Sequence, residues 1–488
     1  MTTSGPTIRA SCPAGRITGL DRDATLVFKG VQFAGAPRLN PADDVESWSG
    51  TYDATAYRPQ APQNPSTIER LLGGSPPPMA EDCLHLNIHT PACDAKRRPV
   101  LFWLHGGSFL TGGGAVPWYD GSRLAARGDV VVVTINYRLG ALGFLGTRNT
   151  GITDQISALR WVERNIEAFG GSPDNVTVFG ESAGGCAAIA LLATPHADTL
   201  FQRAWAMSPS IPQIRTSAHG EHTEQEFLNA LQASDCVDPH KASIEDLLTA
   251  QAATDAKASG NLKTFSPTEG TDAIPEPILD VVATDHRPLV MGSTRDEWSL
   301  FSAFDSSRAN WNRSDIEREF ARRFPDDPET AIELYSERAP GVTASQLVSA
   351  MQTDEIFRGP IWSLIEERVA KHSLSSSWMY AFDYASPSFG GILGSCHALD
   401  IPFAFDNLHQ PGVDAFAGSG DNRQGVADQF SNAIISFAKH GNPGWEQYAK
   451  GTRATQRIGP QPKLLQDPDE DLRCLWQHRR DARSKRPR

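Results

Sequence analysis

Two spacings of apolar residues alternate along this chain and predict its secondary structure. Short apolar runs rich in β-branched residues predict strands, and they cover residues 85–90, 100–104, 130–137, 176–179, 203–207, 288–291 and 378–382. The runs at 100–104 and 130–137 are apolar over most of their length, which is typical of strands covered by helices on both faces. The pattern therefore predicts a buried central sheet.

A helical spacing separates several of these runs. Residues 154–169 carry apolar side chains at three- and four-residue steps, with Thr153 or Asp154 as the expected cap and Gly170-Gly171 as the stop. The same periodicity recurs at about 354–372 and 425–440. Strand, helix and strand in succession predict right-handed parallel crossovers and hence an α/β fold.

The remaining segments suggest how the chain is organised around that sheet. Residues 24–34 predict an N-terminal hairpin broken at Gly30. Segments at about 211–285 and 300–375 predict helical insertions that hold the pocket wall. Because no repeat or sharp linker divides the chain, we expect residues 1–478 to form one decorated domain. The basic stretch 479–488 predicts a disordered tail.

Composition narrows the class of protein. The 488 residues include 40% hydrophobic ones and carry a formal charge of −13, which argues against an extended nucleic-acid surface. The seven cysteines are scattered and form no C-x-x-C pair, so neither a disulfide framework nor a structural zinc site is expected. No signal-peptide core and no bilayer-length apolar run is visible, so a cytoplasmic location without a membrane partner is predicted.

The stretch Gly180-Glu-Ser-Ala-Gly184 matches the nucleophile-elbow pattern G-x-S-x-G. It lies between the apolar run 176–179 and an Ala-rich helical pattern that begins at Ala183. Gly180 and Gly184 lack a Cβ, which lets a tight strand-to-helix turn close and raises the Ser182 hydroxyl above the sheet. An ordinary glycine turn between strand and helix is the alternative, so partners elsewhere in the chain must decide.

Candidate partners of Ser182 are found on both sides of it in sequence. His105-Gly-Gly-Ser108 follows the run 100–104, as in loops whose backbone N–H groups bind a substrate oxyanion. Among thirteen histidines, His397 is the best candidate base because it lies in a small-residue loop after a strand. Asp296 and Glu297 follow another strand end and could orient that base, but spacing does not choose between them or exclude Asp272.

Several ordered motifs resemble the type-B carboxylesterases, a branch of the α/β-hydrolases that includes bacterial para-nitrobenzyl esterases, cholinesterases and some lipases. The motifs are Phe28-Lys-Gly30, Glu81-Asp-Cys-Leu-His-Leu-Asn87, His105-Gly-Gly-Ser-Phe109, Tyr119-Asp-Gly121, Asn136-Tyr-Arg-Leu-Gly140, Asp154-Gln155, Phe169-Gly-Gly171, Gly180-Glu-Ser-Ala-Gly184, Thr294-Arg-Asp-Glu297 and His397 before Asp400-Ile-Pro-Phe403. The resemblance implies an α/β-hydrolase fold, with a mostly parallel sheet flanked by helices.

The same resemblance assigns roles to individual residues. It implies Ser182 as nucleophile, His397 as base and Glu297 as the acid that orients the base. The oxyanion donors would be the N–H groups of Gly107, Ser108 and Ala183, and Ser208 would support the triad from behind. A metal or cofactor is not implied.

Other positions refine the expectation. Cys83 stands where secreted relatives have a disulfide partner, but the loop before it contains no cysteine, so we expect a free thiol. The loop 64–80 lacks the tryptophan with which cholinesterases bind choline, so a choline ester is not the expected preferred substrate. Phe109 and parts of 64–80 and 298–303 are expected to line the pocket. Glu181 is expected to follow the strand, in a buried structural role away from the base.

The sequence thus predicts a serine carboxylic-ester hydrolase that forms an acyl-enzyme with small to medium esters and has broad specificity. One alternative is a non-catalytic adhesion or scaffold relative, which usually lacks a member of the triad. The other is a serine peptidase or amidase, which usually carries a separate propeller domain, whereas this sequence shows no propeller-like repeats. The sequence does not choose between monomer and dimer.

Overall fold

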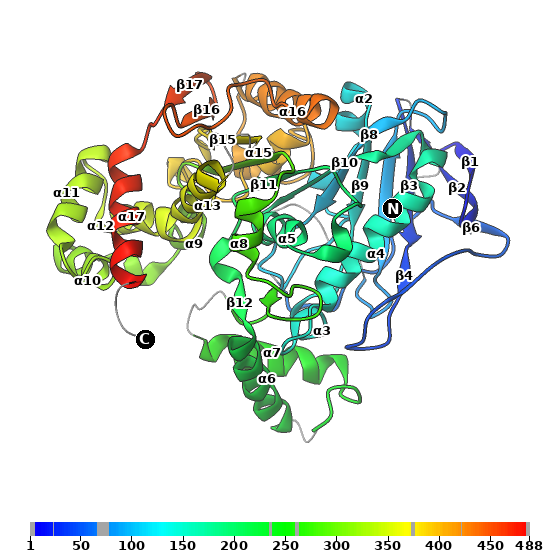
Figure 1. The fold of residues 1–488 in the computed structure, drawn as a ribbon, viewed down its shortest axis with the longest axis horizontal. Coiled ribbons are helices and arrows are strands. Elements are labelled where there is room, and N and C mark those ends of the chain that lie inside the picture. Colours follow the sequence, from blue (N-terminus) through cyan, green and yellow to red (C-terminus); the bar gives the residue numbers. More distant parts are fainter. Residues whose placement is uncertain are drawn as a thin grey trace.

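A computed structural model describes residues 5–22, 24–65, 78–233, 237–258, 263–371, 376–420 and 422–484. Its main feature is a sheet of thirteen strands in this described part, in the order β1-β2-β3-β7-β9-β8-β10-β11-β14-β15-β16-β17, with β6 beside β2 (Figure 1). The strands are β1 (Thr7–Cys12), β2 (Gly15–Arg22), β3 (Thr25–Gln32), β6 (Thr51–Asp53), β7 (His85–Thr90), β8 (Arg98–Leu104), β9 (Val131–Ile135), β10 (Gly171–Glu181), β11 (Arg203–Met207), β14 (Leu289–Thr294), β15 (Ser377–Phe382), β16 (Ala454–Ile458) and β17 (Lys463–Gln466).

The centre of the sheet is parallel and its margins are antiparallel. From β9 through β16 in this order, every neighbouring pair runs parallel. The strand β7 on one side and β17 on the other run antiparallel to their neighbours β9 and β16. Each run that predicted a strand lies in this sheet, and the predicted α/β-hydrolase fold is confirmed.

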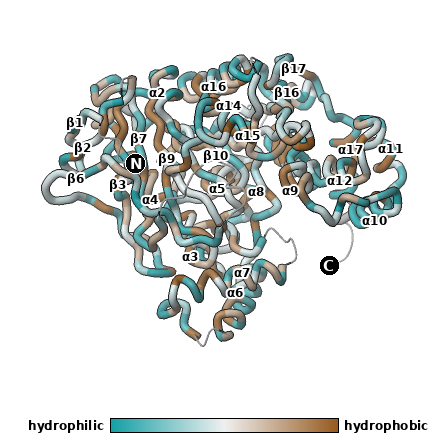
Figure 2. The backbone as a smooth tube through the Cα atoms, turned by 180° about the vertical axis from the view of Figure 1, so that it is seen from behind, coloured by the Kyte–Doolittle hydropathy of each residue, from teal (hydrophilic) through white to brown (hydrophobic). Residues whose placement is uncertain are grey.

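The apolar run of β8 has a simple structural reason. Val100, Phe102 and Leu104 belong to one buried cluster, which also contains residues of α4 (Thr150–Asn165) and α5 (Ala183–Leu192). Leu101 and Trp103 belong to a second cluster, with residues of α2 (Ser122–Gly128) and α16 (Asn422–His440). Both faces of the strand are therefore covered, so alternate positions cannot be polar. Figure 2 shows apolar stretches along central strands such as β9, whereas peripheral α10 is largely hydrophilic.

Two predicted boundaries differ from the structure. The segment 24–34 is not a hairpin, because β3 continues through Gly30 with a register shift and pairs with β2 and β7. The helix expected at 154–169 begins at Thr150 and ends in a 3₁₀ turn at Ile166–Phe169. Asp154 is not its cap, since it is fully buried and binds the Arg138 guanidinium at 2.6 and 2.8 Å.

The two long polar segments are mainly helical. The first contains β12 (Arg215–Thr216), α6 (Ser217–Gln232), α7 (Ile244–Lys257), β13 (Thr268–Glu269) and α8 (Ile278–Thr284). The second contains α9 (Ser299–Ser302), α10 (Arg313–Arg323), α11 (Pro328–Arg338), α12 (Ala344–Thr353), a π-helical turn (Asp354–Arg358) and α13 (Gly359–Lys371). In Figure 1, α10, α11 and α12 lie together with the C-terminal α17 at one end of the molecule.

The expected disordered tail at 479–488 is wrong for its first residues. The helix α17 (Glu470–Ser484) extends into this stretch, and residues 485–488 lie outside the described residues. The Arg479 guanidinium donates to the Arg323 carbonyl oxygen at 2.7 Å and lies 4.8 Å over the Trp476 ring. The positive charge of this stretch predicted a solvated, disordered tail. The contacts of Arg479 instead hold the end of α17 against the rest of the protein.

The described chain also contains three short helices, α3 (Gly140–Phe144), α14 (Ile401–Ala404) and α15 (Val413–Ala417), and a two-residue pairing of β4 (Ala34–Gly35) with β5 (Asp43–Asp44). No helix in the described residues is long and apolar enough to cross a bilayer. The six cysteines in the described part, Cys83 included, form no disulfide with one another.

Candidate active site

Ser182 occupies the turn between β10 and α5, at the carboxyl end of the central strands. Its φ of 58° and ψ of −119° lie outside the usual regions for a residue with a side chain, a strain that costs on the order of 1–3 kcal/mol. The backbones around it leave no room for side chains, because a Cβ on Gly184 would lie 2.0 Å from the Leu104 carbonyl oxygen. The structure thus has the geometry of a nucleophile elbow.

The loop after β8 faces this turn. Gly107 and Ser108 have φ of 105° and 56°, and neither N–H takes part in a backbone hydrogen bond within the described residues. Ala183 is the first residue of α5, so its N–H has no partner inside the helix. These three N–H groups are those that the sequence predicts as oxyanion donors.

His105 orders this loop. It is buried, its Nδ1 lies 2.8 Å from the Gly106 carbonyl oxygen, and its ring stacks on Tyr137 at 4.4 Å between centroids. Burial lowers the pKa of His105 to about 4, so the ring is neutral at pH 7. This environment agrees with the prediction that His105 belongs to the loop and is not the base.

His397 and Glu297 form a buried pair beside Ser182. His397 Nδ1 and Glu297 Oε2 lie 2.5 Å apart, and Glu297 is fully buried. The other carboxylate oxygen of Glu297 accepts hydrogen bonds from the Thr294 N–H at 2.6 Å and the Ser208 hydroxyl at 2.5 Å. Ser208 therefore lies behind the pair, where the resemblance places it.

The structure distinguishes the three acids, Asp272, Asp296 and Glu297, between which residue spacing did not choose. Asp296 points away from His397, since its carboxylate binds the Ser395 N–H at 2.8 Å and the Arg295 guanidinium. Asp272 is exposed in the first helical segment. Of the three candidate acids, only Glu297 reaches the His397 ring among the described contacts.

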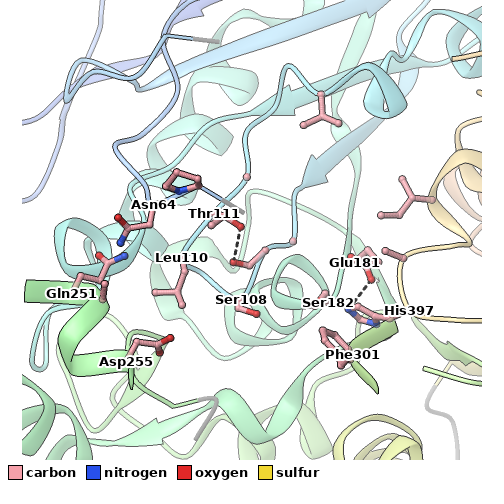
Figure 3. Close-up of a pocket in the computed structure, with 18 of the residues that line it drawn as sticks. Asn64, Ser108, Leu110, Thr111, Glu181, Ser182, Gln251, Asp255, Phe301 and His397 are labelled. Carbon is pink, nitrogen blue, oxygen red and sulfur yellow. Dashed lines mark hydrogen bonds and ion pairs between the residues drawn. The ribbon is translucent and has the colours of Figure 1, made fainter. Parts of the chain in front are cut away.

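Glu181 corrects the sequence-based expectation. Its side chain was expected to follow the strand, but its Oε1 lies 3.1 Å from His397 Nε2 (Figure 3). The two atoms are not aligned as a hydrogen bond, and no other hydrogen-bonding group in the described chain satisfies this buried oxygen. Strand alternation did not predict this placement because the elbow turns the backbone at the end of β10.

The buried acids control protonation at the site. Burial alone would lower the pKa of His397, but the charges of Glu181 and Glu297 raise it to about 9. Burial and the neighbouring Glu297 raise the pKa of Glu181 to about 7. Asp400 is also fully buried, and its pKa is raised by burial and by Glu181 and Glu297. The site therefore favours the imidazolium form of His397.

No hydrogen bond joins the Ser182 hydroxyl to His397 within the described residues. His397 Nε2 faces Glu181 instead, while Ser182 lies beside both in the same pocket (Figure 3). Such contacts in enzymes without bound substrate are commonly long and shorten when substrate binds.

Two phenylalanine rings pack against the His397 ring. The centroids of Phe301 and Phe357 lie 5.4 and 4.7 Å from that of His397. Phe301 belongs to the predicted pocket segment 298–303, whereas Phe357 comes from the π-helical turn and was not predicted. In the sequence, Phe357 lies in a segment with helical periodicity. That periodicity does not reveal a π-helical turn, so the position of its side chain could not be predicted.

A pocket of about 430 Å³ opens in front of these residues. Its lining includes Ser108, Leu110, Ser182 and His397 (Figure 3). Phe109 does not line it, because its fully buried ring packs on Phe144 at 5.0 Å. Of the predicted loop 64–80, Asn64 and Pro65 reach the pocket, and residues 66–77 lie outside the described residues.

The described residues contain no group of three or more His, Cys, Asp or Glu side chains arranged to hold a metal ion. The pocket offers side chains for proton transfer and backbone donors for a developing negative charge. That combination suits nucleophilic attack on a carbonyl carbon.

Comparisons with known proteins agree with this chemistry. Residues 4–474 match the carboxylesterase family. The chain is 36% identical to the para-nitrobenzyl esterase of Bacillus subtilis (strain 168) over 483 residues, covering 94% of this chain and 96% of the relative. It is 33% identical to the phenmedipham hydrolase of Pseudarthrobacter oxydans, covering 90% and 91% of the two chains.

Solved structures show the same relationship. The Geobacillus stearothermophilus carboxylesterase superposes with a TM-score of 0.83 at 32% identity, covering 96% of this chain and 99% of the other. Sequence and fold therefore agree over nearly the whole length. The chain belongs to the carboxylesterase family, in its type-B branch, and is a carboxylic-ester hydrolase.

Proposed function

We propose that this hydrolase works through an acyl-enzyme formed on Ser182. The observation that carries the proposal is the buried Glu297–His397 pair, in which His397 lines the same pocket as the elbow serine. His397 Nε2 accepts the Ser182 proton as the hydroxyl oxygen attacks the ester carbonyl carbon. Glu297 holds the ring through Nδ1 and stabilises the imidazolium that forms.

The developing oxyanion is bound by the N–H groups of Gly107, Ser108 and Ala183. Each such donor is typically worth about 10²–10³ in rate. His397 then gives its proton to the leaving alkoxide as the carbon–oxygen bond breaks. Water, activated by the neutral ring, attacks the acyl-enzyme and releases the acid and Ser182.

We further propose small to medium carboxylic esters as substrates, with broad specificity. A pocket of about 430 Å³ lies within the usual range for small-molecule sites, and its wall includes apolar groups such as Leu110 and Phe301. The name of the Bacillus subtilis relative makes para-nitrobenzyl esters suitable first substrates. The scattered, odd-numbered cysteines support a cytoplasmic location, which cell fractionation tests.

Substitution of the serine is the direct test. We expect Ser182→Ala to lower kcat for para-nitrophenyl butyrate by about 10⁴-fold or more, because no other hydroxyl in the described chain is held at the elbow. The control is Ser336→Ala on α11, whose hydroxyl donates to the Ile332 carbonyl oxygen far from the pocket lining. Unchanged hydrolysis by Ser182→Ala would refute the assignment. A matched amide hydrolysed as fast as the ester would favour the peptidase alternative.

A further inference from the structure

The wall of the pocket across from Ser182 contains a carboxylate that the proposed chemistry does not use. Asp255 lies on α7 and lines the same cavity as Ser182 and His397. In Figure 3 it stands with Asn64 and Gln251 on one side of the pocket, with Ser182, Glu181 and His397 on the other. Gln251 precedes Asp255 by one helical turn, so both side chains project from the same face of α7.

Neighbouring contacts hold this part of α7 in place. Gln251 Oε1 accepts the Ala141 N–H at 2.9 Å, at the start of α3. A Cβ on Gly140 would lie 1.9 Å from that oxygen, so the close approach depends on a glycine. Asn64 Nδ2 donates to the Leu248 carbonyl oxygen of α7 at 3.0 Å. These contacts hold the turn of α7 that precedes Asp255 against the pocket wall.

The charge of Asp255 is not balanced nearby in the described chain. No hydrogen bond or ion pair of its carboxylate to another described residue is found, although the group is half-buried. Lys257, two residues later, lies 3.6 Å from Glu226 instead. With Asn64 Nδ2 already used, the amide oxygen of Asn64 also remains an acceptor. This side of the pocket thus offers acceptors and negative charge.

We propose that Asp255 is a specificity residue that selects esters carrying a protonated amine. The inference rests on the proposed function, because it concerns the occupant of the Ser182 pocket. A primary or secondary ammonium group fits best, since charge-assisted N–H···O⁻ bonds to a carboxylate are stronger than neutral ones. A quaternary ammonium group has no N–H to donate and fits less well. The ester carbonyl lies at Ser182, and the ammonium group reaches across the cavity to α7.

The test compares charged and neutral esters of the same length. One series consists of para-nitrophenyl esters of ω-amino acids with increasing chain length, and each is paired with its alkyl isostere. A second series places the amine on the alcohol side. We expect the wild-type protein to prefer the ammonium ester over its isostere at one chain length at least. Asp255→Asn should reduce the ratio of kcat/KM for the ammonium ester to kcat/KM for its isostere about tenfold. A factor of this size corresponds to the free energy of one hydrogen bond to a charged group.

Three comparisons make the result specific. Glu245→Gln removes the same charge from an exposed position of α7 and should leave the ratio unchanged. Asp255→Glu keeps the charge and should retain the preference with a different best chain length. Added salt should weaken the wild-type preference, because it screens a half-exposed pair. Thermal unfolding of each variant checks that α7 stays folded.

The outcomes separate the two proposals. If the neutral esters are hydrolysed and depend on Ser182, but Asp255→Asn leaves the ratio unchanged, the specificity inference is wrong. It is equally wrong if the wild-type protein shows no preference for the ammonium ester in either series. If Ser182→Ala still hydrolyses the neutral esters, the proposed mechanism fails first.

Discussion

Three carboxyl groups, those of Glu181, Glu297 and Asp400, surround one histidine in a place largely closed to water. All three are buried, and Asp400 has no hydrogen-bond partner for either side-chain oxygen within the described chain. Burial raises the pKa of Glu181 and of Asp400, and the neighbouring carboxylates raise both further because like charges this close do not ionise together easily. Of the three, Glu297 has partners on both carboxylate oxygens among the described residues, His397 on one and Ser208 on the other.

Removal of the Glu181 charge should shift the pH dependence of the enzyme. His397 acts as a base only when neutral, and its raised pKa of about 9 means that activity rises with pH toward that value. Glu181, with a pKa of about 7, is mainly charged above pH 7 and there stabilises the imidazolium 3.1 Å away. Glu181→Gln should therefore move the midpoint of the kcat/KM profile down by about one unit or more.

The profile should be measured from pH 6 to 10 with a neutral ester. Asp255→Asn is the matched control, because it removes a pocket carboxylate on the opposite side from His397. Its midpoint should stay close to that of the wild-type protein. A Glu181→Gln midpoint equal to the wild-type value would mean that Glu181 does not set the His397 pKa.

At the scale of elements, the elbow depends on how closely α5 approaches β8. The backbone of Gly184 packs directly on the end of β8, where a side chain would overlap the Leu104 carbonyl oxygen. Overpacking of a buried site commonly costs about 1–3 kcal/mol, and a backbone clash cannot be relieved by a rotamer change. We expect Gly184→Ala to lower both Tm and the yield of active enzyme. The fractional loss of kcat should be larger than the fractional loss of folded protein.

A second glycine serves as the control for this substitution. Gly425 lies on α16, and a Cβ there would meet nothing within 4 Å in the described chain. Gly425→Ala should leave activity unchanged and stabilise the protein by about 0.4–1 kcal/mol, because alanine restricts the unfolded chain more than glycine does. Active-site titration with an organophosphate, combined with thermal unfolding, separates the two effects. Equal behaviour of both variants would contradict the role assigned to Gly184.

The central strands of the sheet were predictable because burial on two faces leaves a plain apolar pattern, as in β8, whereas β1, β2, β6, β16 and β17 were not predicted. The elbow and the glycine loop were predictable because their geometry requires glycine at fixed positions. The choice of Glu297 over Asp296 came only from the resemblance, since two adjacent acids after one strand end look alike in sequence. The placements of Phe357, Phe109 and Glu181 depend on local backbone turns, which apolar periodicity does not record.

At the scale of the molecule, the C-terminal helix connects the end of the chain to the site. Trp476 on α17 donates to the Tyr335 hydroxyl at 2.8 Å, and that hydroxyl donates to Asp354 at 2.5 Å. Asp354 begins the π-helical turn that carries Phe357, whose ring packs on His397. The second helical segment is thus held between α17 and the base, which explains why positive charge alone mispredicted the tail.

Substitution of Trp476 tests this connection. Its side chain is buried, and its ring packs edge-on against Phe324 at 5.0 Å. Trp476→Ala should lower the free energy of unfolding by about 3 kcal/mol or more, because it leaves a large cavity. Trp476→Phe keeps an aromatic ring and loses the donor to Tyr335, so it should cost about 1 kcal/mol.

Denaturant unfolding measures both values of the free energy of unfolding. The kcat per titrated serine should fall for Trp476→Ala and stay near the wild-type value for Trp476→Phe. An unaltered unfolding midpoint for Trp476→Ala would mean that α17 is not part of the cooperative fold, and that the contacts of Phe357 with His397 are maintained without it.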